Sequence, residues 1–406
     1  MSNDGIVIVG AGQSGYQLAV SLRAAGYAGR LRLIGDEPVM PYQRPPLSKA
    51  FLAGTCDLSQ ITFQDTNFYH QQKIEFVAGK TVMSIDRASR CALADDDERL
   101  QYQHLVMAVG ARVRTLPFDV GNASGLYHLR TLADAQLLRS ALETARSVVV
   151  VGAGFLGLEF AAIAAARGKQ ISVVETSQQP MSHAVSSTVA HAFRRHHEAS
   201  GVRFLFGDAV ADIQVRNEKI TGIRTASGEH LDADVVVACI GVVPNVELAA
   251  NAGLPVDNGI VVDGCLRTAD PAISALGDCA SFPTRFATAP CRLESIQNAM
   301  DQARHLAQCL TSGGKAGFDA VPWFWSDQGG LKLQIAGLGR GVDTTVVRGD
   351  VDSQRFSVFG FSQDRLVAVE SVGSPGDHMI ARRLLAGSKD VTPAMIADPQ
   401  INLRAL

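Results

Sequence analysis

The stretch Ile6–Gly15 reads IVIVGAGQSG, and the same pattern returns at Val148–Gly157 as VVVVGAGFLG. Each copy begins with four apolar residues, which is typical of a buried strand in a parallel sheet. Each continues into a Gly-x-Gly-x-x-Gly turn and then a helical pattern. In this motif the first glycine allows the tight turn, the second lets a pyrophosphate approach the backbone, and the third lets the helix pack against the strand. One copy is a weak signal, but two copies in this setting predict two dinucleotide-binding folds.

An acidic residue follows each copy at the distance where a carboxylate can bind a ribose hydroxyl. Asp36 lies 24 residues after Gly12, and Glu175 lies 21 residues after Gly154. Glu175 would repel a 2′-phosphate, and residues 176–180 contain no Arg or Lys to bind one. The sequence therefore predicts that the second site prefers NADH to NADPH.

The composition is that of a globular protein with two or three domains. Of 406 residues, 47% are hydrophobic and 19% are charged, which allows a full core. The formal net charge of −3 argues against a nucleic-acid-binding protein. The apolar segment 148–166 is interrupted by three glycines and Glu159, so it predicts a strand, a turn and a helix rather than a membrane span. The start, MSNDGIVIVG, has no secretory signal, and we expect a cytoplasmic protein.

Seven cysteines are scattered along the chain, and the closest two, Cys279 and Cys291, are 12 residues apart. This spacing indicates reduced thiols. The sequence contains no four-cysteine run for an iron–sulfur cluster and no pattern of metal ligands, so we expect no metal in this chain. His196 and His197, which follow two arginines, are interpreted as part of a solvated helix face.

The later part of the chain returns to the first fold and then adds a third segment. Gly259–Asp263 and Leu266–Thr268 are predicted as strands, and Ile273–Leu276 is a short apolar run before Gly277-Asp278. Beyond residue 320, alternating segments predict a small antiparallel sheet with one or two helices.

Four motifs, in this order, resemble those of the two-dinucleotide-domain flavoprotein reductases: GAGQSG (10–15), VVVVGAGFLGLE (148–159), ACIGVVPN (238–245) and ALGDCA (275–280). The resemblance covers essentially the whole chain. PYQRPPLSKAFLAG (41–54) and PWFWSDQ (322–328) are similar to one subgroup. This is the group typified by putidaredoxin reductase, the NADH-dependent ferredoxin reductases that serve bacterial cytochromes P450 and ring-hydroxylating dioxygenases. The resemblance implies FAD in the first site and NADH in the second.

The same resemblance implies a fold and a domain division. The fold class is α/β, with two Rossmann-like dinucleotide-binding domains of the glutathione-reductase type and a small α+β C-terminal domain. The FAD domain is expected to be discontinuous, at 1–112 and 246–320. The NADH domain is expected at 113–245 and the C-terminal domain at 321–406.

Matching positions imply the residues of the FAD site. Lys49, in RPPLSK, would lie close to the flavin N5 edge, although the residues alone also allow a solvated surface lysine. Asp278 would bind a ribitol hydroxyl, and Ile296 would place a backbone N–H near the flavin C2 carbonyl. The full expected set is Gly10, Gly12, Ser14, Gly15, Asp36, Arg44, Lys49, Val82, Arg130, Asp278 and Ile296.

The NADH site is implied in the same way. Glu159 would lie beside the nicotinamide and could pair with Lys49. A helix-surface charge is the alternative, but Glu159 sits among apolar residues, where a carboxylate needs a partner or a ligand. The full expected set is Gly152, Gly154, Phe155, Leu156, Gly157, Glu159, Glu175, Ile240 and Gly241.

Both tryptophans of the chain lie in WFW, at 323 and 325. On a strand they share one face, and Phe324 takes the other. We expect Trp325 to lie next to the isoalloxazine and Trp323 to pack beneath it. Lys49, Glu159 and Trp325 are the expected catalytic residues.

The resemblance also bears on where electrons go. Disulfide reductases of related architecture use a close cysteine pair after the first strand pair, and residues 36–44 contain no cysteine. We therefore expect direct electron transfer to a docked one-electron carrier, a [2Fe–2S] ferredoxin. Arg304 matches a position of the docking face, with a solvated arginine as the alternative. We expect a monomer or a weak dimer that binds no nucleic acid and no membrane.

Two other functions stay open. One is a rubredoxin reductase or another NADH:acceptor reductase. The other is a non-enzymatic redox protein of the apoptosis-inducing-factor type.

Overall fold

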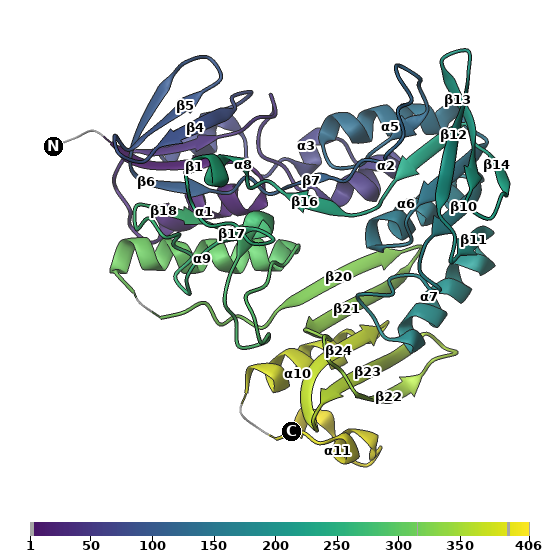
Figure 1. Cartoon of the computed structure of the whole chain (residues 1–406). Coiled ribbons are helices and arrows are strands. Elements are labelled where there is room, and N and C mark those ends of the chain that lie inside the picture. The colour runs from purple at the N-terminus through teal and green to yellow at the C-terminus, as the bar shows by residue number, and fades with distance from the viewer. Residues whose placement is uncertain (1–3, 315, 388–389, 406) are drawn as a thin grey trace. The chain divides into compact units, whose positions relative to one another are not determined.

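The computed structural model describes residues 4–314, 316–387 and 390–405 (Figure 1). The described chain divides into two compact units, and each is treated by itself. Unit 1 lies within residues 1–43, 58–112 and 243–322, and unit 2 within residues 44–57, 113–242 and 323–406. The expected three-domain division stays a prediction.

Unit 1 is built on a mixed sheet whose first strand is the apolar run IVIV. The strand order is β3-β2-β1-β6-β5-β4, and β18 also pairs with β6. Strands β1, β2, β3, β6 and β18 are parallel, whereas β4 and β5 are antiparallel additions. The bounds are β1 Gly5–Val9, β2 Leu31–Ile34, β3 Ile74–Val77, β4 Val82–Asp86, β5 Cys91–Ala94, β6 Arg99–Met107 and β18 Ile273–Ala275.

Two helices of unit 1 pack together. Helix α1 (Gln13–Ala24) buries a stripe that includes Leu18 and Leu22, one turn apart, and packs against α9 (Ile296–Ser312). Ser295 caps α9, because its hydroxyl accepts a hydrogen bond from the N–H of Asn298 at 3.1 Å. The other elements of this unit are α3 Leu58–Ile61, α4 Thr66–Gln71, α8 Glu247–Asn251, β17 Ile260–Val261, η2 Gly277–Cys279 and β19 Ala280–Ser281. Strands β7 (Ala111–Val113) and β16 (Val242–Pro244) lie where the chain passes between the two units.

The first part of unit 2 is a second parallel sheet. Its order is β11-β10-β9-β15-β8, and β9 (Ser147–Val151) is the apolar run VVVV. A small antiparallel sheet, β12-β13-β14, follows β11 in the chain. The bounds are β8 Leu126–Tyr127, β10 Gln170–Glu175, β11 Val202–Phe206, β12 Val210–Arg216, β13 Lys219–Thr225, β14 His230–Asp232 and β15 Val235–Ala238.

The helices of this part are η1 Pro45–Ser48, α2 Ala50–Ala53, α5 Leu132–Thr144, α6 Phe155–Ala166 and α7 Ser187–Ala199.

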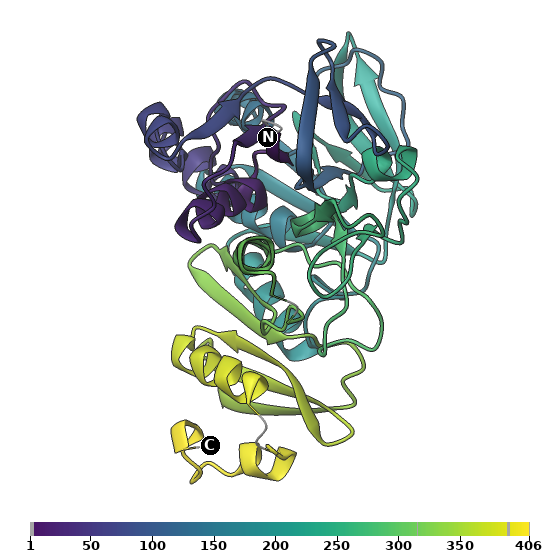
Figure 2. The same cartoon turned by 90° about the vertical axis from the view of Figure 1, so that its left-hand side faces the viewer.

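Unit 2 also contains the C-terminal sheet, in the order β20-β21-β24-β23-β22, antiparallel throughout. Helix α10 lies along one face of this sheet in both views (Figures 1 and 2). The bounds are β20 Trp323–Gln328, β21 Leu331–Gly337, β22 Thr344–Asp350, β23 Arg355–Ser362, β24 Arg365–Val372, α10 Pro375–Ala386, α11 Pro393–Ala397 and η3 Leu403–Ala405.

A buried carboxylate joins the C-terminal sheet to helix α7. Glu370, on β24, accepts hydrogen bonds from the N–H of Ser186 at 2.8 Å and from its hydroxyl at 2.5 Å. Ser186 is itself the N-cap of α7. Burial raises the pKa of Glu370, and the two bonds from Ser186 oppose that rise.

The expected α/β class, with two dinucleotide-binding folds and an α+β C-terminal part, is confirmed. One predicted strand is wrong. Leu266–Thr268 forms a tight turn in which Leu266 has a left-handed φ of 62°, and only Arg267 makes an isolated bridge, to Ser274. None of the helices in the described residues is long and apolar enough to cross a membrane.

Candidate active site

The two glycine loops have nearly the same geometry, each in its own unit. In unit 1, Gly10 has a φ of 105°, and a Cβ there would lie 2.3 Å from the carbonyl oxygen of Ala108. A Cβ on Gly15 would lie 1.9 Å from the carbonyl oxygen of Gly10. A Cβ on Gly12 would meet nothing within 4 Å. The first and third glycines are therefore required by packing, and the second leaves the backbone open.

The loop of unit 2 repeats this division. Gly152 has a φ of 101°, and a Cβ there would lie 2.5 Å from the carbonyl oxygen of Cys239. A Cβ on Gly157 would lie 2.2 Å from the carbonyl oxygen of Gly152, whereas one on Gly154 would meet nothing within 4 Å. Both loops thus fit a pyrophosphate that approaches the second glycine at a helix N-terminus.

A pocket of about 430 Å³ opens at the second loop. Glu175 lines it, and its carboxylate accepts hydrogen bonds from the N–H of Ala153 at 2.7 Å and of Ser177 at 2.8 Å. No Arg or Lys is among the described residues that line it. Of the expected NADH residues, the pocket is lined by Gly152, Gly154, Phe155, Glu175, Ile240 and Gly241. Leu156 and Gly157 lie in the first turn of α6 behind them.

Glu159 is the buried charge of α6, with 6% of its surface exposed. Its Oε2 accepts from Lys49 Nζ at 2.7 Å and from the Ser48 hydroxyl at 2.8 Å. Its Oε1 accepts from the Ser326 hydroxyl at 2.7 Å. Both oxygens are therefore occupied by donors, one of them a cation, as a buried carboxylate requires. The expected pairing of Lys49 with Glu159 is present.

A chain of buried polar groups extends from this carboxylate. Gln328 donates to the Ser326 hydroxyl at 3.1 Å, and its amide oxygen bonds His197 Nε2 at 2.9 Å. Burial lowers the pKa of His197, whose ring is 1% exposed. The prediction of a solvated helix face at His196–His197 is therefore wrong for His197. Its position four residues after Phe193 and eight after Val189 places it on the buried stripe of α7, and this spacing was the available signal.

Ser48, Ser326 and Gln328 were not predicted as functional residues. Single hydroxyl and amide side chains have no sequence pattern of their own, so only the hydrogen bonds of the fold link them to Glu159. Strand β20 supplies two of them, because Ser326 and Gln328 share one face of a strand with period two.

The opposite face of β20 carries the two tryptophans. Their ring centroids are 5.9 Å apart. Trp323 packs on α10, with its ring 5.3 Å from that of His378 and the Arg382 guanidinium 4.5 Å above it. Trp325 is half-buried. Phe324, on the other face, lies 4.5 Å from the ring of Phe155 on α6.

Two further residues expected at FAD lie in unit 2. Arg44, the N-terminal residue of η1, donates to the carbonyl oxygen of Arg130 at 2.7 Å. Arg44, Lys49 and Arg130 are therefore expected FAD residues that lie in unit 2, the unit that contains Glu159.

The remaining FAD residues lie in unit 1. Ser14 is buried beside Gly277, where a Cβ would lie 2.8 Å from the Ser14 hydroxyl. Gly277 also donates its N–H to Gln302 of α9 at 2.7 Å. Asp278 follows in η2, and its carbonyl oxygen accepts from Arg292 at 3.1 Å.

Three expected residues of unit 1 lie at separate places. Asp36, after β2, is exposed. Val82 is buried on β4, with β5 and β6 between it and β1 in the sheet. Ile296 is the first residue of α9.

Arg304 lies farther along α9. Its side chain is 51% exposed and forms an ion pair with Asp301 at 3.0 Å. An exposed pair of this kind contributes little stability, and it leaves the arginine accessible to solvent.

Two glycine loops of this geometry, each on a parallel sheet, define an oxidoreductase with two dinucleotide-binding folds. The family model "pyridine nucleotide-disulphide oxidoreductase" matches residues 4–303, and the model "reductase C-terminal" matches residues 323–406. The chain belongs to the pyridine nucleotide-disulphide oxidoreductase family. The expected FAD and NADH cofactors are confirmed by this membership.

Named relatives cover the whole length. Rhodocoxin reductase of Rhodococcus erythropolis is 47% identical over 399 residues, which are 98% of this chain and 93% of that protein. Putidaredoxin reductase of Pseudomonas putida is 37% identical over 411 residues, with 100% and 97% covered. The solved structure of a ferredoxin reductase for the CYP199A2 system from Rhodopseudomonas palustris has a TM-score of 0.96 and 43% identity, with 99% of each chain covered. The expected resemblance is confirmed.

Proposed function

We propose that this protein is an NADH-dependent ferredoxin reductase that passes electrons singly to a [2Fe–2S] ferredoxin, which feeds a cytochrome P450 or a ring-hydroxylating oxygenase. The relatives support this at full length. The putidaredoxin reductase–putidaredoxin complex is similar over 100% of this chain, with a TM-score of 0.96 and 36% identity.

The observation that carries the proposal is the state of Cys279, the thiol next to the expected FAD residue Asp278. It is fully buried, and its Sγ lies 3.3 Å from the carbonyl oxygen of Leu276. Burial raises its pKa to about 11, so the thiol stays protonated and unreactive at neutral pH. A buried free thiol of this kind disfavours a disulfide relay through Cys279, which supports the proposal that electrons pass to a separate carrier.

When bound, FAD supplies the chemistry of accepting a hydride and releasing electrons one at a time. The protein's residues bind and orient the nucleotides for it. Gly154 admits the pyrophosphate of NADH, and Glu175 binds the adenosine ribose. Glu159, held by Ser48, Lys49 and Ser326, orients the nicotinamide end.

Glu175 also supports the preference for NADH. Its carboxylate is fixed by two backbone N–H groups, so it cannot turn away from a 2′-phosphate. Among the described residues, those that line the pocket include no Arg or Lys that would offset the repulsion.

The test is steady-state turnover of the holoprotein with NADH or NADPH and either a [2Fe–2S] ferredoxin or a rubredoxin, with cytochrome c as the final reporter. We expect NADH and the ferredoxin to give the highest kcat/KM. NADH oxidation that stops after one equivalent with every ferredoxin tried would overturn the proposal. Faster turnover with rubredoxin would select the rubredoxin reductase instead. A rubredoxin-NAD(+) reductase from Pseudomonas putida is 38% identical to this chain over 91% of its length.

Trp325 is proposed to shield the flavin and to border the ferredoxin-docking face. Replacing it by Phe or Ala should lower ferredoxin reduction, whereas NADH reduction of FAD serves as the internal reference. Trp323→Phe, on the same face of β20, is the matched control. Equal rates in Trp325→Ala and the parent protein would remove Trp325 from the site.

Arg304 is proposed to contact an acidic ferredoxin. Arg304→Glu should raise the KM for ferredoxin several-fold at low salt, and the difference should fade as salt screens it. Arg224→Glu, at an exposed position on β13, is the control for net charge. An unchanged KM would show that Arg304 is only solvated.

A cytoplasmic location is also proposed. All seven cysteines are free thiols, the state expected in a reducing compartment.

A further inference from the structure

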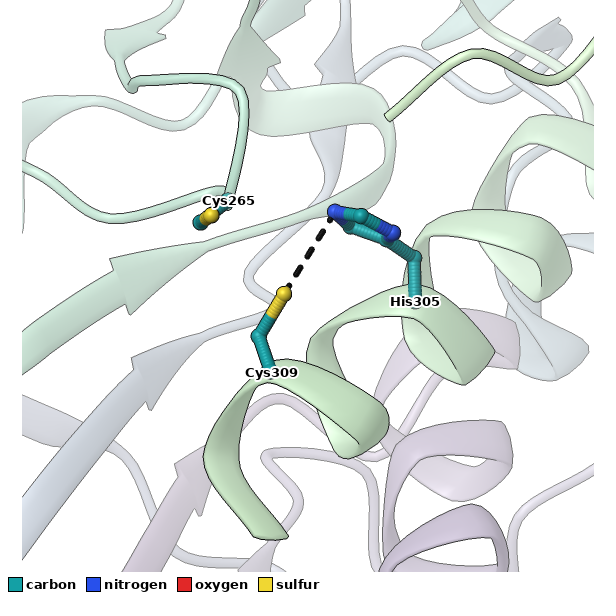
Figure 3. A group of neighbouring side chains, drawn as sticks. All are labelled: Cys265, His305 and Cys309. Atoms are coloured by element: carbon teal, nitrogen blue, oxygen red, sulfur yellow. Dashed lines mark hydrogen bonds between the residues drawn. The ribbon is translucent and has the colours of Figure 1, made fainter. Parts of the chain in front are cut away.

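Two cysteines and a histidine that are far apart in the sequence meet in unit 1. Their ligand atoms, Cys265 Sγ, Cys309 Sγ and one ring nitrogen of His305, all lie within 4.8 Å of one another. Cys265 comes from the turn after β17, and the other two are four residues apart on one face of α9. Figure 3 shows the three side chains converging, with Cys309 bonded to the ring of His305.

The turn that presents Cys265 is fixed by its own hydrogen bonds. The Asp263 carboxylate accepts from the N–H of Cys265 at 2.8 Å and from the N–H of Arg267 at 2.9 Å. Leu266 holds a left-handed φ of 62°, an unfavourable conformation for a branched side chain. Strain of this kind persists only where the surroundings fix it, and it is common at ligand sites.

The ring of His305 is also held in place. Its Nε2 lies 3.0 Å from the carbonyl oxygen of Gly264, and the Phe318 ring packs edge-on at 5.6 Å between centroids. Phe318 is bonded to the same turn, since its N–H donates to the Gly264 carbonyl at 2.8 Å. These contacts hold the ring beside the turn in the metal-free protein, and the bond from Nε2 to the Gly264 carbonyl must break before Nε2 can bind a metal.

One of the three distances between the donors matches a tetrahedral metal ion, and the other two are no longer than 4.8 Å. With Zn–S near 2.3 Å and Zn–N near 2.0 to 2.1 Å, a tetrahedral angle separates S and N by about 3.5 Å. The distance between Cys309 Sγ and His305 Nε2 is 3.5 Å. We propose that Cys265, His305 and Cys309 form a zinc site, with a water molecule as the fourth ligand.

The charges of such a site balance. Two thiolates neutralise the two positive charges of zinc, so a site with two buried cysteines carries no net charge. Binding releases the two thiol protons, and the proton on His305 moves from Nε2 to Nδ1. The Gly264 carbonyl then loses the imidazole donor but keeps the N–H of Phe318.

The charged groups around the thiols influence this exchange. Burial and the neighbouring Cys265 raise the pKa of Cys309 to about 11, with Arg267 opposing and Asp263 adding to the rise. Zinc must therefore displace the Cys309 proton in order to bind its thiolate.

The zinc would link two segments of unit 1. It ties the turn 263–267 to the C-terminal half of α9, the helix that begins at Ile296. None of its three ligands is an expected FAD or NADH residue, so the zinc site stands independently of the proposed function.

The test measures metal in the intact flavoprotein. Native mass spectrometry after incubation with one equivalent of Zn²⁺ should show one zinc per chain and the loss of two protons. Cys309→Ser and Cys265→Ser should each weaken binding at least a hundredfold. Cys56→Ser, which removes a half-buried thiol of unit 2, should leave it unchanged.

Cobalt provides a readout that needs no variant. Co²⁺ in the parent protein should give the strong ligand-field bands of a tetrahedral site at wavelengths longer than the flavin absorbs, and zinc should remove them. Absence of these bands together with no zinc retained would overturn the proposal. Retention of zinc by both Cys265→Ser and Cys309→Ser would overturn it as well.

Discussion

The two glycine loops share a backbone but differ in the side chains around them. In unit 2 the acid at the strand end, Glu175, is held by the N–H groups of Ala153 and Ser177. In unit 1 the corresponding Asp36 is exposed, and its carboxylate has no hydrogen bond within the described residues. The carboxylate of Glu175 is thus held by backbone donors, whereas the carboxylate of Asp36 faces solvent.

The helices after the loops differ in the same direction. Two residues after the third glycine, α1 carries Gln17, which is half-buried and, within the described part of the chain, donates a hydrogen bond to Ser21 of its own helix at 3.0 Å. The same position of α6 carries the buried Glu159, bonded by residues from two other segments. One backbone pattern therefore supports a plain helix in unit 1 and a charged site in unit 2.

The largest effect should come from closing the second loop. Gly154→Val places a side chain in open space at a φ of −75°, which valine accepts, so the fold should be unchanged. It blocks the pyrophosphate, and we expect kcat/KM for NADH to fall about a hundredfold, or about 2.7 kcal/mol. Gly12→Val should instead lose FAD, measured by the flavin-to-protein ratio. If Gly154→Val lost FAD as well, the two loops would not act separately.

Substitutions at Glu159 and its donor Ser326 should have the second-largest effect. Replacing Glu159 by Gln removes a charge that holds Lys49, and Ser326→Ala removes one of its donors. Losing a hydrogen bond to a charged group costs about 2 kcal/mol, so we expect hydride transfer from NADH to slow about thirtyfold in Glu159→Gln and less in Ser326→Ala. Stopped-flow flavin reduction measures both. Gln17→Leu is the matched control in α1, and equal slowing there would contradict a special role for the α6 position.

Glu175 should have a smaller effect, confined to nucleotide choice. Glu175→Ala removes the repulsion of a 2′-phosphate together with a ribose acceptor. We expect the ratio of kcat/KM for NADH over NADPH to drop about tenfold, or about 1.4 kcal/mol. His183→Ala, which changes the same pocket without touching the acid, should preserve the ratio. If Glu175→Ala preserved the ratio, another residue would determine the preference for NADH.

A buried histidine should give the smallest effect, on stability. Each unit has one whose pKa burial lowers to about 4, His104 in unit 1 and His378 in unit 2. His104 bonds Ser274, whereas both ring nitrogens of His378 are buried without a partner in the described residues. The two units therefore differ in how well the ring is satisfied.

The sign follows from the lowered pKa. As pH falls, the unfolded chain protonates His378 near pH 6.5, whereas the folded chain does so only near pH 4. The neutral ring therefore makes its full contribution to the free energy of unfolding above pH 6.5, and this contribution is lost as pH falls toward 4. The loss is about 1 kcal/mol at pH 6 and grows below it. His378→Phe keeps the contact with Trp323 and should flatten the pH dependence of the thermal midpoint. If the thermal midpoint of His378→Phe depended on pH as steeply as that of the parent protein, another group would cause the pH dependence.

Sequence reasoning succeeded where chemistry is local. The glycine loops, the apolar strands and the acids at the strand ends follow from short-range rules. The first and third glycines of each loop are required by backbone atoms that lie close to them, and the second leaves the backbone open. The class of protein followed from the spacing of these motifs together with family resemblance.

What it missed depends on contacts across long separations. Ser326 and Glu159 are 167 residues apart, and His197 and Gln328 are 131 apart. A lone serine or histidine gives no pattern until the fold places its partner. The turn at Leu266 failed as a strand for a local reason, because the Asp263 side chain accepts from N–H groups that a strand would have used. The convergence of Cys265 on α9 was likewise invisible in the cysteine spacing.

The bond between Glu370 and Ser186 has a consequence for synthesis. The two residues are 184 positions apart, and ribosomes add roughly 5 to 20 residues per second. Helix α7 therefore emerges roughly ten to forty seconds before the carboxylate that binds its first residue. Ser326 reaches Glu159 after a similar delay. During that interval the nascent second nucleotide fold exposes the faces that the C-terminal sheet later covers, and this is when a chaperone has most to bind.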